Sequence, residues 1–169
     1  ETINVAYGTN ILSVLPSTDV EGYIFVGWYY NDTEITEDST MPNNNITIIG
    51  RYKKEVFEVR VVDGDMVVFD TICEYKTTLN SILSNDIVKD YVLTESANGY
   101  TVVFTLNGKE VDESMEVKEN LDIIVEKEPN TYVIIFKNGE NIISTETKKF
   151  GEIIVYPVVE NKIENDIEY

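Results

Sequence analysis

The residues of this chain that could carry chemistry are one cysteine and many carboxylates, because the sequence contains no histidine. Without imidazole, Ser-His and Cys-His nucleophilic pairs, histidine-ligated zinc and histidine acid–base catalysis are all excluded. Cys73 is the single cysteine, so no disulfide forms within the chain. Its strand-like surroundings predict a small packed side chain instead of a nucleophile. The sequence therefore predicts no catalytic residue, no cofactor and no enzyme.

The carboxylates gather in two places that offer oxygen ligands of the kind Ca²⁺ prefers. One is the Asp63-Gly64-Asp65 turn, and the other comprises Asp32, Glu34, Glu37 and Asp38. Neither follows the spacing of a calcium-binding loop, D-x-[DN]-x-[DN]-G-x₅-E. Solvated turns explain both groups, so we predict no metal site. A carboxylate pair for glycoside hydrolysis would also need a cleft, and nothing in the sequence predicts one.

An aromatic stretch runs through Tyr23, Phe25, Trp28, Tyr29 and Tyr30. It could form a stacking platform for sugars, but core packing is favoured because alternate strand residues must face inward. We expect Tyr29 or Tyr30 to be the exposed ring. No binding site is assigned to this stretch.

Composition narrows the class of protein. The net charge of −18 repels phosphate backbones and anionic lipid surfaces, so nucleic acid is not an expected partner. No apolar run approaches the roughly 20 residues of a membrane-spanning helix, so direct membrane insertion is not expected either. A hydrophobic content of 43%, rich in Val, Ile, Thr and Tyr, predicts a folded chain dominated by β-structure.

Two segments of the sequence resemble each other at an offset of about 75 residues. Residues 22–55 and 99–128 both begin with Gly-Tyr and an apolar strand, then turn at Asn31-Asp32 or Asn107-Gly108. Residues 57–65 and 132–140 match each other at an offset of 75. These matches divide the chain into three repeats: 1–54, which lacks its opening strand; 55–129, which is complete but divergent; and 130–169, the front half of a third. With Glu1 in place of an initial Met, we expect a segment of a longer array.

The complete repeat shows the expected elements. Residues 56–62 alternate as a half-buried strand, and Asp63-Gly64 predicts a hairpin into residues 66–72. Residues 78–84 are the one plausible helix, capped by Thr78 and carrying Leu79, Ile82 and Leu83 on one face. Further strands are expected at 100–106 and 120–126, and in the first repeat at 23–30 and 46–52. The order β-β-α-β-(β)-β predicts a β-dominated α+β fold.

The first repeat resembles a known family. Residues 22–29 (GYIFVGWY), Met41-Pro42 and residues 46–52 (ITIIGRY) resemble the Listeria–Bacteroides repeat, the B repeat of internalin-like surface proteins. Tyr7-Gly8 and Pro16 stand where that family has Tyr-Gly and Pro. Residues 55–129 depart from the pattern, because Val103-Phe104-Thr105 replaces Gly-Trp-Tyr. The resemblance implies tandem β-grasp (ubiquitin-like) units outside the cell, on the cell surface or cell wall, with no active site.

Together these observations predict a non-enzymatic segment that acts as a stalk, spacer or adhesion module of a cell-surface protein. Its expected partners are neighbouring repeats of the same chain, and a protein or glycan of a host or neighbouring cell. The alternative is a dedicated protein- or carbohydrate-binding module, with recognition carried by an exposed sheet edge or turn of 55–129 and tested at exposed aromatics such as Tyr91 or Tyr100. Binding that is lost on changing those rings would favour the alternative.

Overall fold

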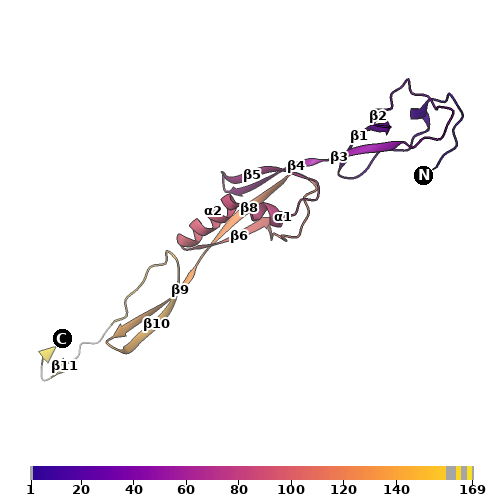
Figure 1. Ribbon diagram of the computed structural model, residues 1–169. Coiled ribbons are helices and arrows are strands. Elements are labelled where there is room, and N and C mark those ends of the chain that lie inside the picture. The colour runs from indigo at the N-terminus through magenta and orange to yellow at the C-terminus, as the bar shows by residue number, and fades with distance from the viewer. Residues whose placement is uncertain (1, 159–162, 165–166, 169) are drawn as a thin grey trace. The chain divides into compact units, whose positions relative to one another are not determined.

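Strands dominate the computed structural model, which describes residues 2–158, 163–164 and 167–168 (Figure 1). By the contacts between its residues the chain forms two compact units. The first comprises Glu1–Arg60, Asp70–Leu83 and Asp112–Asp122, and the second comprises Val61–Phe69, Ser84–Val111 and Ile123–Tyr169. In chain order the elements are η1 (Ile11–Val14), β1 (Tyr23–Tyr30), β2 (Thr33–Glu34), β3 (Ile49–Lys54), β4 (Val56–Asp63), β5 (Met66–Glu74), α1 (Leu79–Leu83), α2 (Asp86–Ala97), β6 (Tyr100–Leu106), β7 (Lys109–Glu110), β8 (Leu121–Pro129), β9 (Thr131–Asn138), β10 (Asn141–Lys149), β11 (Ile163–Glu164) and β12 (Ile167–Glu168).

Four sheets make up the described chain. The strand orders are β2-β1-β3, β5-β4-β8-β6-β7, β10-β9 and β11-β12. No described strand before Glu55 shares a sheet with a strand after it. The three larger sheets are formed by residues 23–54, 56–129 and 131–149, so each sheet is built from its own stretch of sequence.

Most of the expected strands are confirmed. β1 and β6 have the predicted bounds, and β4 buries Val59 and Val61 completely, as its alternation required. β1 pairs antiparallel with β3, the partner predicted from residues 46–52, although the strand begins only at Ile49. Gly64 turns the β4–β5 hairpin at a positive φ of 57°.

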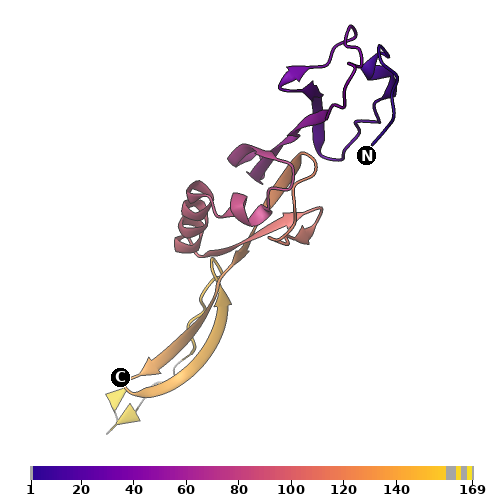
Figure 2. The ribbon, with the colours of Figure 1, turned by 45° about the vertical axis from the view of Figure 1, so that its right-hand side comes forward.

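The helical content exceeds the prediction. α1 is the expected helix, and it buries Leu79, Ile82 and Leu83. The expectation that residues 78–84 are the one helix was wrong, because α2 (Asp86–Ala97) follows it and packs against β6 (Figure 2). Among the residues of α2 only Val88 is buried, so the sequence lacks the broad apolar stripe that usually marks a helix.

A backbone hydrogen-bond pattern occurs twice. The Gly8 N–H donates to the Met41 carbonyl at 2.9 Å, and the Met41 N–H donates to the Thr9 carbonyl at 2.8 Å. The same pair of bonds links Lys76, Val117 and Thr77, both at 2.8 Å. This repetition lies at matching places in the sequence, immediately before η1 and α1.

Further bonds repeat in the same order. The Ile11 N–H bonds the Ser39 carbonyl, and the Leu79 N–H bonds the Met115 carbonyl, each at 3.0 Å. The Asn10↔Thr40 bridge has a counterpart in Thr78↔Glu116. Residues 7–54 and 75–129 therefore share one backbone plan.

The β1–β2 and β6–β7 hairpins also resemble each other in pairing and in turn conformation. Tyr29 pairs with Glu34 and Tyr30 with Thr33, while Thr105 pairs with Glu110 and Leu106 with Lys109. Asn31 and Asp32 have φ of 43° and 61°, and Asn107 and Gly108 have φ of 53° and 72°. Two successive positive-φ residues make the tight primed turn that suits twisted strands.

Candidate functional site

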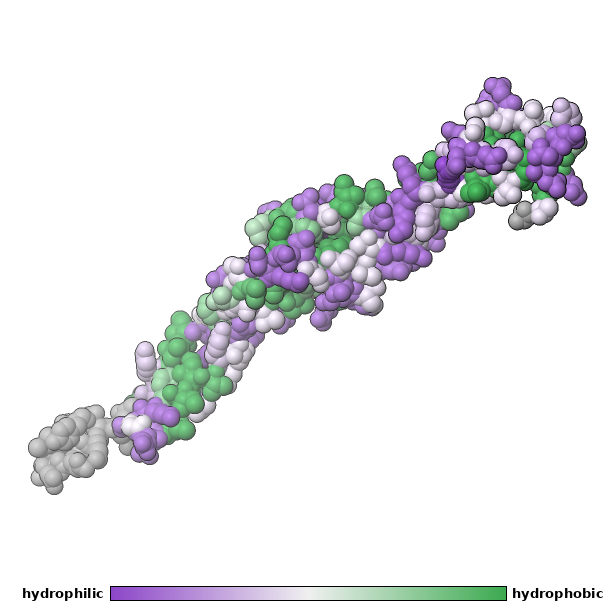
Figure 3. Space-filling model, in the orientation of Figure 1, coloured by the Kyte–Doolittle hydropathy of each residue, from purple (hydrophilic) through white to green (hydrophobic). Residues whose placement is uncertain are grey.

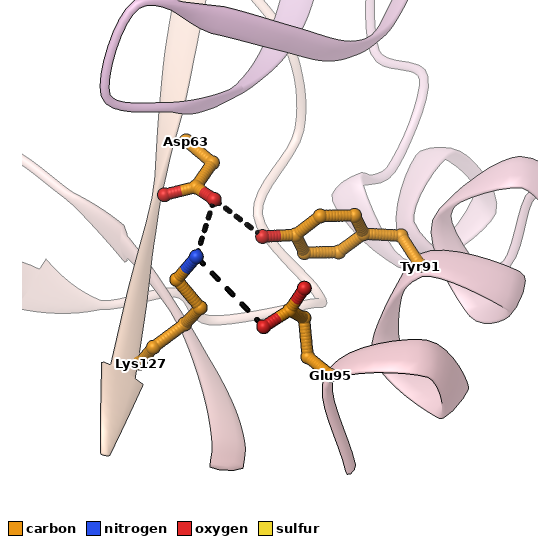
Figure 4. Close-up of polar contacts among 4 residues, drawn as sticks. All are labelled: Asp63, Tyr91, Glu95 and Lys127. Atoms are coloured by element: carbon orange, nitrogen blue, oxygen red, sulfur yellow. Dashed lines mark hydrogen bonds and ion pairs between the residues drawn. The ribbon is translucent and has the colours of Figure 1, made fainter. Parts of the chain in front are cut away.

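The best-organised polar group of the structure is the Asp63 cluster, formed by Asp63, Tyr91, Glu95 and Lys127 (Figure 4). Asp63 ends β4, and Lys127 lies on β8. Tyr91 and Glu95 are four residues apart on α2, so they share one helix face. Three elements distant in sequence thus meet at one carboxylate.

Geometry identifies the role of each group. The Tyr91 hydroxyl and the Lys127 ammonium both donate to Asp63 Oδ2, each at 2.7 Å. The Glu95 carboxylate lies 3.8 Å from the same ammonium. A carboxylate that accepts two donors, one of them charged, makes strong charge-assisted bonds.

The protonation states suit a structural clamp. Hydrogen bonding from Lys127, and then from Tyr91, lowers the pKa of Asp63. The bond to Asp63 raises the pKa of Lys127, so its amine stays charged and unreactive as a nucleophile. Burial, and then the bond to Asp63, raises the pKa of Tyr91 to about 12, which keeps its hydroxyl a donor. The cluster holds α2 to its strands and offers no free base.

Tyr91 and Tyr100, the two rings expected to be exposed for recognition, are packed within the chain. Tyr91 is half-buried in the Asp63 cluster, and Tyr100 is half-buried with its ring centroid 5.4 Å from that of Phe150. The expectation that these rings are exposed was wrong, because each is occupied by a neighbour within the chain.

The aromatic stretch of β1 is mostly packed. Phe25 lies between Trp28 and Tyr52, at centroid distances of 5.4 and 5.3 Å. Tyr29 is half-buried beneath the Arg51 guanidinium, 4.1 Å above its ring, and Tyr30 is half-buried too. Tyr23 is the more exposed ring, so the solvent-facing position falls at the start of the strand.

A partly open pocket of about 640 Å³ lies among residues 2–48. Trp28, Ile11 and the aliphatic residues Ile46 and Ile48 line it. Ile46 and Ile48 are half-buried, whereas their sequence counterparts Leu121 and Ile123 in β8 are buried. β8 lies between β4 and β6, but β3 is at an edge with only β1 beside it.

Two carboxylates of the acidic groups are paired with other side chains. Asp63 is occupied by Lys127 and Tyr91, and Asp32 pairs with Arg51 in the turn after β1. Within the described ranges, no three His, Cys, Asp or Glu side chains are placed to hold a metal ion. Burial raises the pKa of the half-buried Cys73 thiol, which disfavours a reactive thiolate.

Comparison with known families finds one match, in the N-terminal segment. Residues 1–49 match the Listeria-Bacteroides repeat domain. The match covers η1, β1 and β2 and ends as β3 begins. The Listeria-Bacteroides repeat occurs in surface proteins, so residues 1–49 are similar to a repeat module of surface proteins. No curated protein and no solved structure gives a significant match.

Sequence reasoning missed the Asp63 cluster, because its members lie up to 64 residues apart. The cap of α2 was the available signal for the helix that carries two of them: Asn85 precedes an acidic first turn. No helix among the described residues has the length and apolar character needed to cross a bilayer.

Proposed function

We propose that this chain is a tandem repeat segment of a cell-surface protein, and that it serves as a non-enzymatic spacer or adhesion stalk. One observation carries the proposal: the backbone hydrogen-bond plan of residues 7–54, most of which lie in the match to the Listeria-Bacteroides repeat domain, recurs in residues 75–129. Successive copies of one small fold are the usual construction of stalks and extended arrays.

The proposed units are 1–54, 55–129 and 130–169. The second has the strand order β5-β4-β8-β6-β7, with both helices following the first hairpin, which supports a complete β-grasp unit. The first has no opening hairpin beside β3, and its half-buried Ile46 and Ile48 line a cavity where such a hairpin would pack.

The third unit is represented by its opening hairpin. β9 pairs with β10 from Thr131↔Lys149 to Asn138↔Asn141. Figure 3 shows hydrophobic residues gathered over this hairpin, where Val133 and Ile142 are 63% and 60% exposed. The β9–β10 hairpin corresponds to the β4–β5 hairpin. It differs in that its apolar face is not covered by the rest of a sheet.

Charge supports an array. With a net charge of −18, neighbouring units repel one another and remain soluble at close spacing. The proposal includes a location outside the cell, on the surface or wall, and the repeat family supports it.

Cell-surface display tests the spacer function. One, two or three copies of the chain are placed between a membrane anchor and an epitope tag, and the height of the tag above the membrane is measured. A stalk predicts a height that grows linearly with copy number. A height that follows the square root of copy number is the behaviour of a flexible chain, and it would contradict the spacer.

The same displayed cells separate adhesion from pure spacing. They are tested for binding to glycan arrays and to host-cell surface protein. Binding to either would support an adhesion module, whereas no binding with a linear height series supports the spacer alone.

A further inference from the structure

An aromatic ring covers a glycine at two equivalent places in the chain. In the first compact unit, Tyr75 lies on Gly22, and in the second, Phe150 lies on Gly99. Both glycines are buried, and both have positive φ, 75° and 91°. A side chain at either position would be strained and would collide with the ring: a Cβ on Gly22 would overlap Tyr75, and a Cβ on Gly99 would lie 2.6 Å from Phe150.

The backbone around each pair is also the same. The Glu55 N–H donates to the Gly22 carbonyl at 2.9 Å, and the Tyr75 N–H donates to the Glu55 carbonyl at 2.8 Å. Asn130 makes the matching bonds with Gly99 and Phe150, again at 2.9 and 2.8 Å. Glu55 and Asn130 are the residues immediately before the opening strands β4 and β9.

The residue after each glycine completes the contact. Tyr23 meets Tyr75 edge to face, with centroids 6.1 Å apart at 70°, and Tyr100 meets Phe150 at 5.4 Å and 75°. The Tyr75 hydroxyl also donates to Glu21 at 3.1 Å. Edge-to-face ring pairs stabilise a contact beyond the area that they bury.

We propose that these groups form a glycine–aromatic clasp that joins each repeat to the next. The clasp comprises a Gly-Tyr pair that starts a central strand, a linker residue that bonds both sides, and the ring that follows the next repeat's hairpin. The ring seats only on a bare glycine surface, so the clasp couples the start of a central strand to the hairpin of the next repeat. This inference rests on the proposed tandem organisation.

Tyr7 presents the ring half of a third clasp. Gly8 follows it at φ 79°, as Lys76 follows Tyr75 at 67° and Gly151 follows Phe150 at 81°. Tyr75 is 4% exposed and Phe150 is 46% exposed, whereas Tyr7 is 77% exposed. The partner that fits Tyr7 is therefore the Gly-aromatic pair of another repeat of this kind.

Proton NMR of the full chain tests the two filled clasps. A glycine beneath an aromatic ring feels the ring current, so the Hα resonances of Gly22 and Gly99 should lie upfield of those of Gly64, which has no neighbour on its Cβ position. Tyr75→Leu should return only the Gly22 resonances to the ordinary range, and Phe150→Leu only those of Gly99. Unshifted glycines, or shifts that survive these substitutions, would overturn the clasp.

A matched pair of alanine variants tests the coupling of units. Gly22→Ala introduces both backbone strain and a collision with Tyr75, while Gly64→Ala, at φ 57°, introduces the strain alone. Measured by ¹⁵N relaxation, residues 23–54 and 56–129 should tumble together in the parent and in Gly64→Ala but separately in Gly22→Ala. Joint tumbling in Gly22→Ala, or separate tumbling in the parent, would refute the coupling. The height series of the displayed protein is a separate measurement. It can therefore support the spacer even when relaxation refutes the coupling of units.

A fused chain tests the docking of Tyr7. Residues 1–149 are joined directly to residues 7–169, which puts the second Tyr7 in the place of Phe150. The Gly99 Hα resonances of the first copy should move upfield and lose that shift on Tyr7→Leu at the junction. No upfield shift would show that Tyr7 is not the ring half of a clasp.

Discussion

At Asp63, one carboxylate oxygen anchors the α2 helix and the β8 strand through Tyr91 and Lys127. The acidic turn that contains Asp63 is evident in the sequence, but its partners are not. Lys127 lies 64 residues away in the sequence. Tyr91 resembles any surface aromatic in the sequence, and only its place on α2 brings its hydroxyl to Asp63. Long-range pairing of this kind depends on the register of the sheet, which composition does not determine.

Removing the Tyr91 hydroxyl should weaken the fold. Tyr91→Phe leaves Asp63 with one donor, and loss of a part-buried hydrogen bond to a charged acceptor costs about 1.5–3 kcal/mol. The measurement is the free energy of unfolding by chemical denaturation. Tyr132→Phe, at an exposed position on β9, is the control and should have no effect. Equal losses in both variants would show that the Asp63 bond contributes nothing.

The Asp63 cluster also predicts an acid dependence. Lys127 and Tyr91 lower the pKa of Asp63 in the folded state, so the charged carboxylate stabilises the fold above its unfolded pKa of about 3.9. This contribution is lost as pH falls through the lower folded pKa. The stability difference between the parent and Asp63→Asn should therefore be full near about pH 6 and shrink below about pH 4.

At the scale of elements, strands were predictable and α2 was not. Alternation predicted β4, which buries Val59 and Val61 on one face. The Gly-Tyr starts, each followed by an apolar run, predicted β1 and β6. In α2, Ile87 and Leu93 are 56% and 67% exposed, so its apolar residues form no inward stripe. Besides the buried Val88, the Asn85 cap and the Asp63 cluster hold this helix in place.

The cap of α2 gives a direct test of that account. The Asn85 side chain accepts a hydrogen bond from the Ile87 N–H at 2.9 Å. Asn85→Ala should lower the free energy of unfolding by about 0.5–2 kcal/mol, while Asn85→Asp keeps an acceptor and should remain close to the parent. Calorimetry or denaturation can compare the three proteins. If Asn85→Asp falls as far as Asn85→Ala, capping is not the cause.

At the scale of the molecule, the repeat offset was predictable because glycines, turns and apolar strands recur together. The clasps were not, since the ring and the glycine of each come from different proposed repeats: Gly22 and Tyr75 are 53 residues apart in the sequence. The divergent residues 103–105 hid how closely the second repeat follows the first, because hydrogen bonds of the backbone, and not side chains, preserve the plan.

Small-angle X-ray scattering of the purified chain tests most directly whether the proposed units 1–54, 55–129 and 130–169 follow one another in line. A compact globule of this length would have a radius of gyration of about 15 Å. Three modules in line, each of about 10 Å radius, predict roughly 20–28 Å, with a long tail in the distribution of interatomic distances. A value close to about 15 Å with a symmetric distribution would contradict the tandem arrangement.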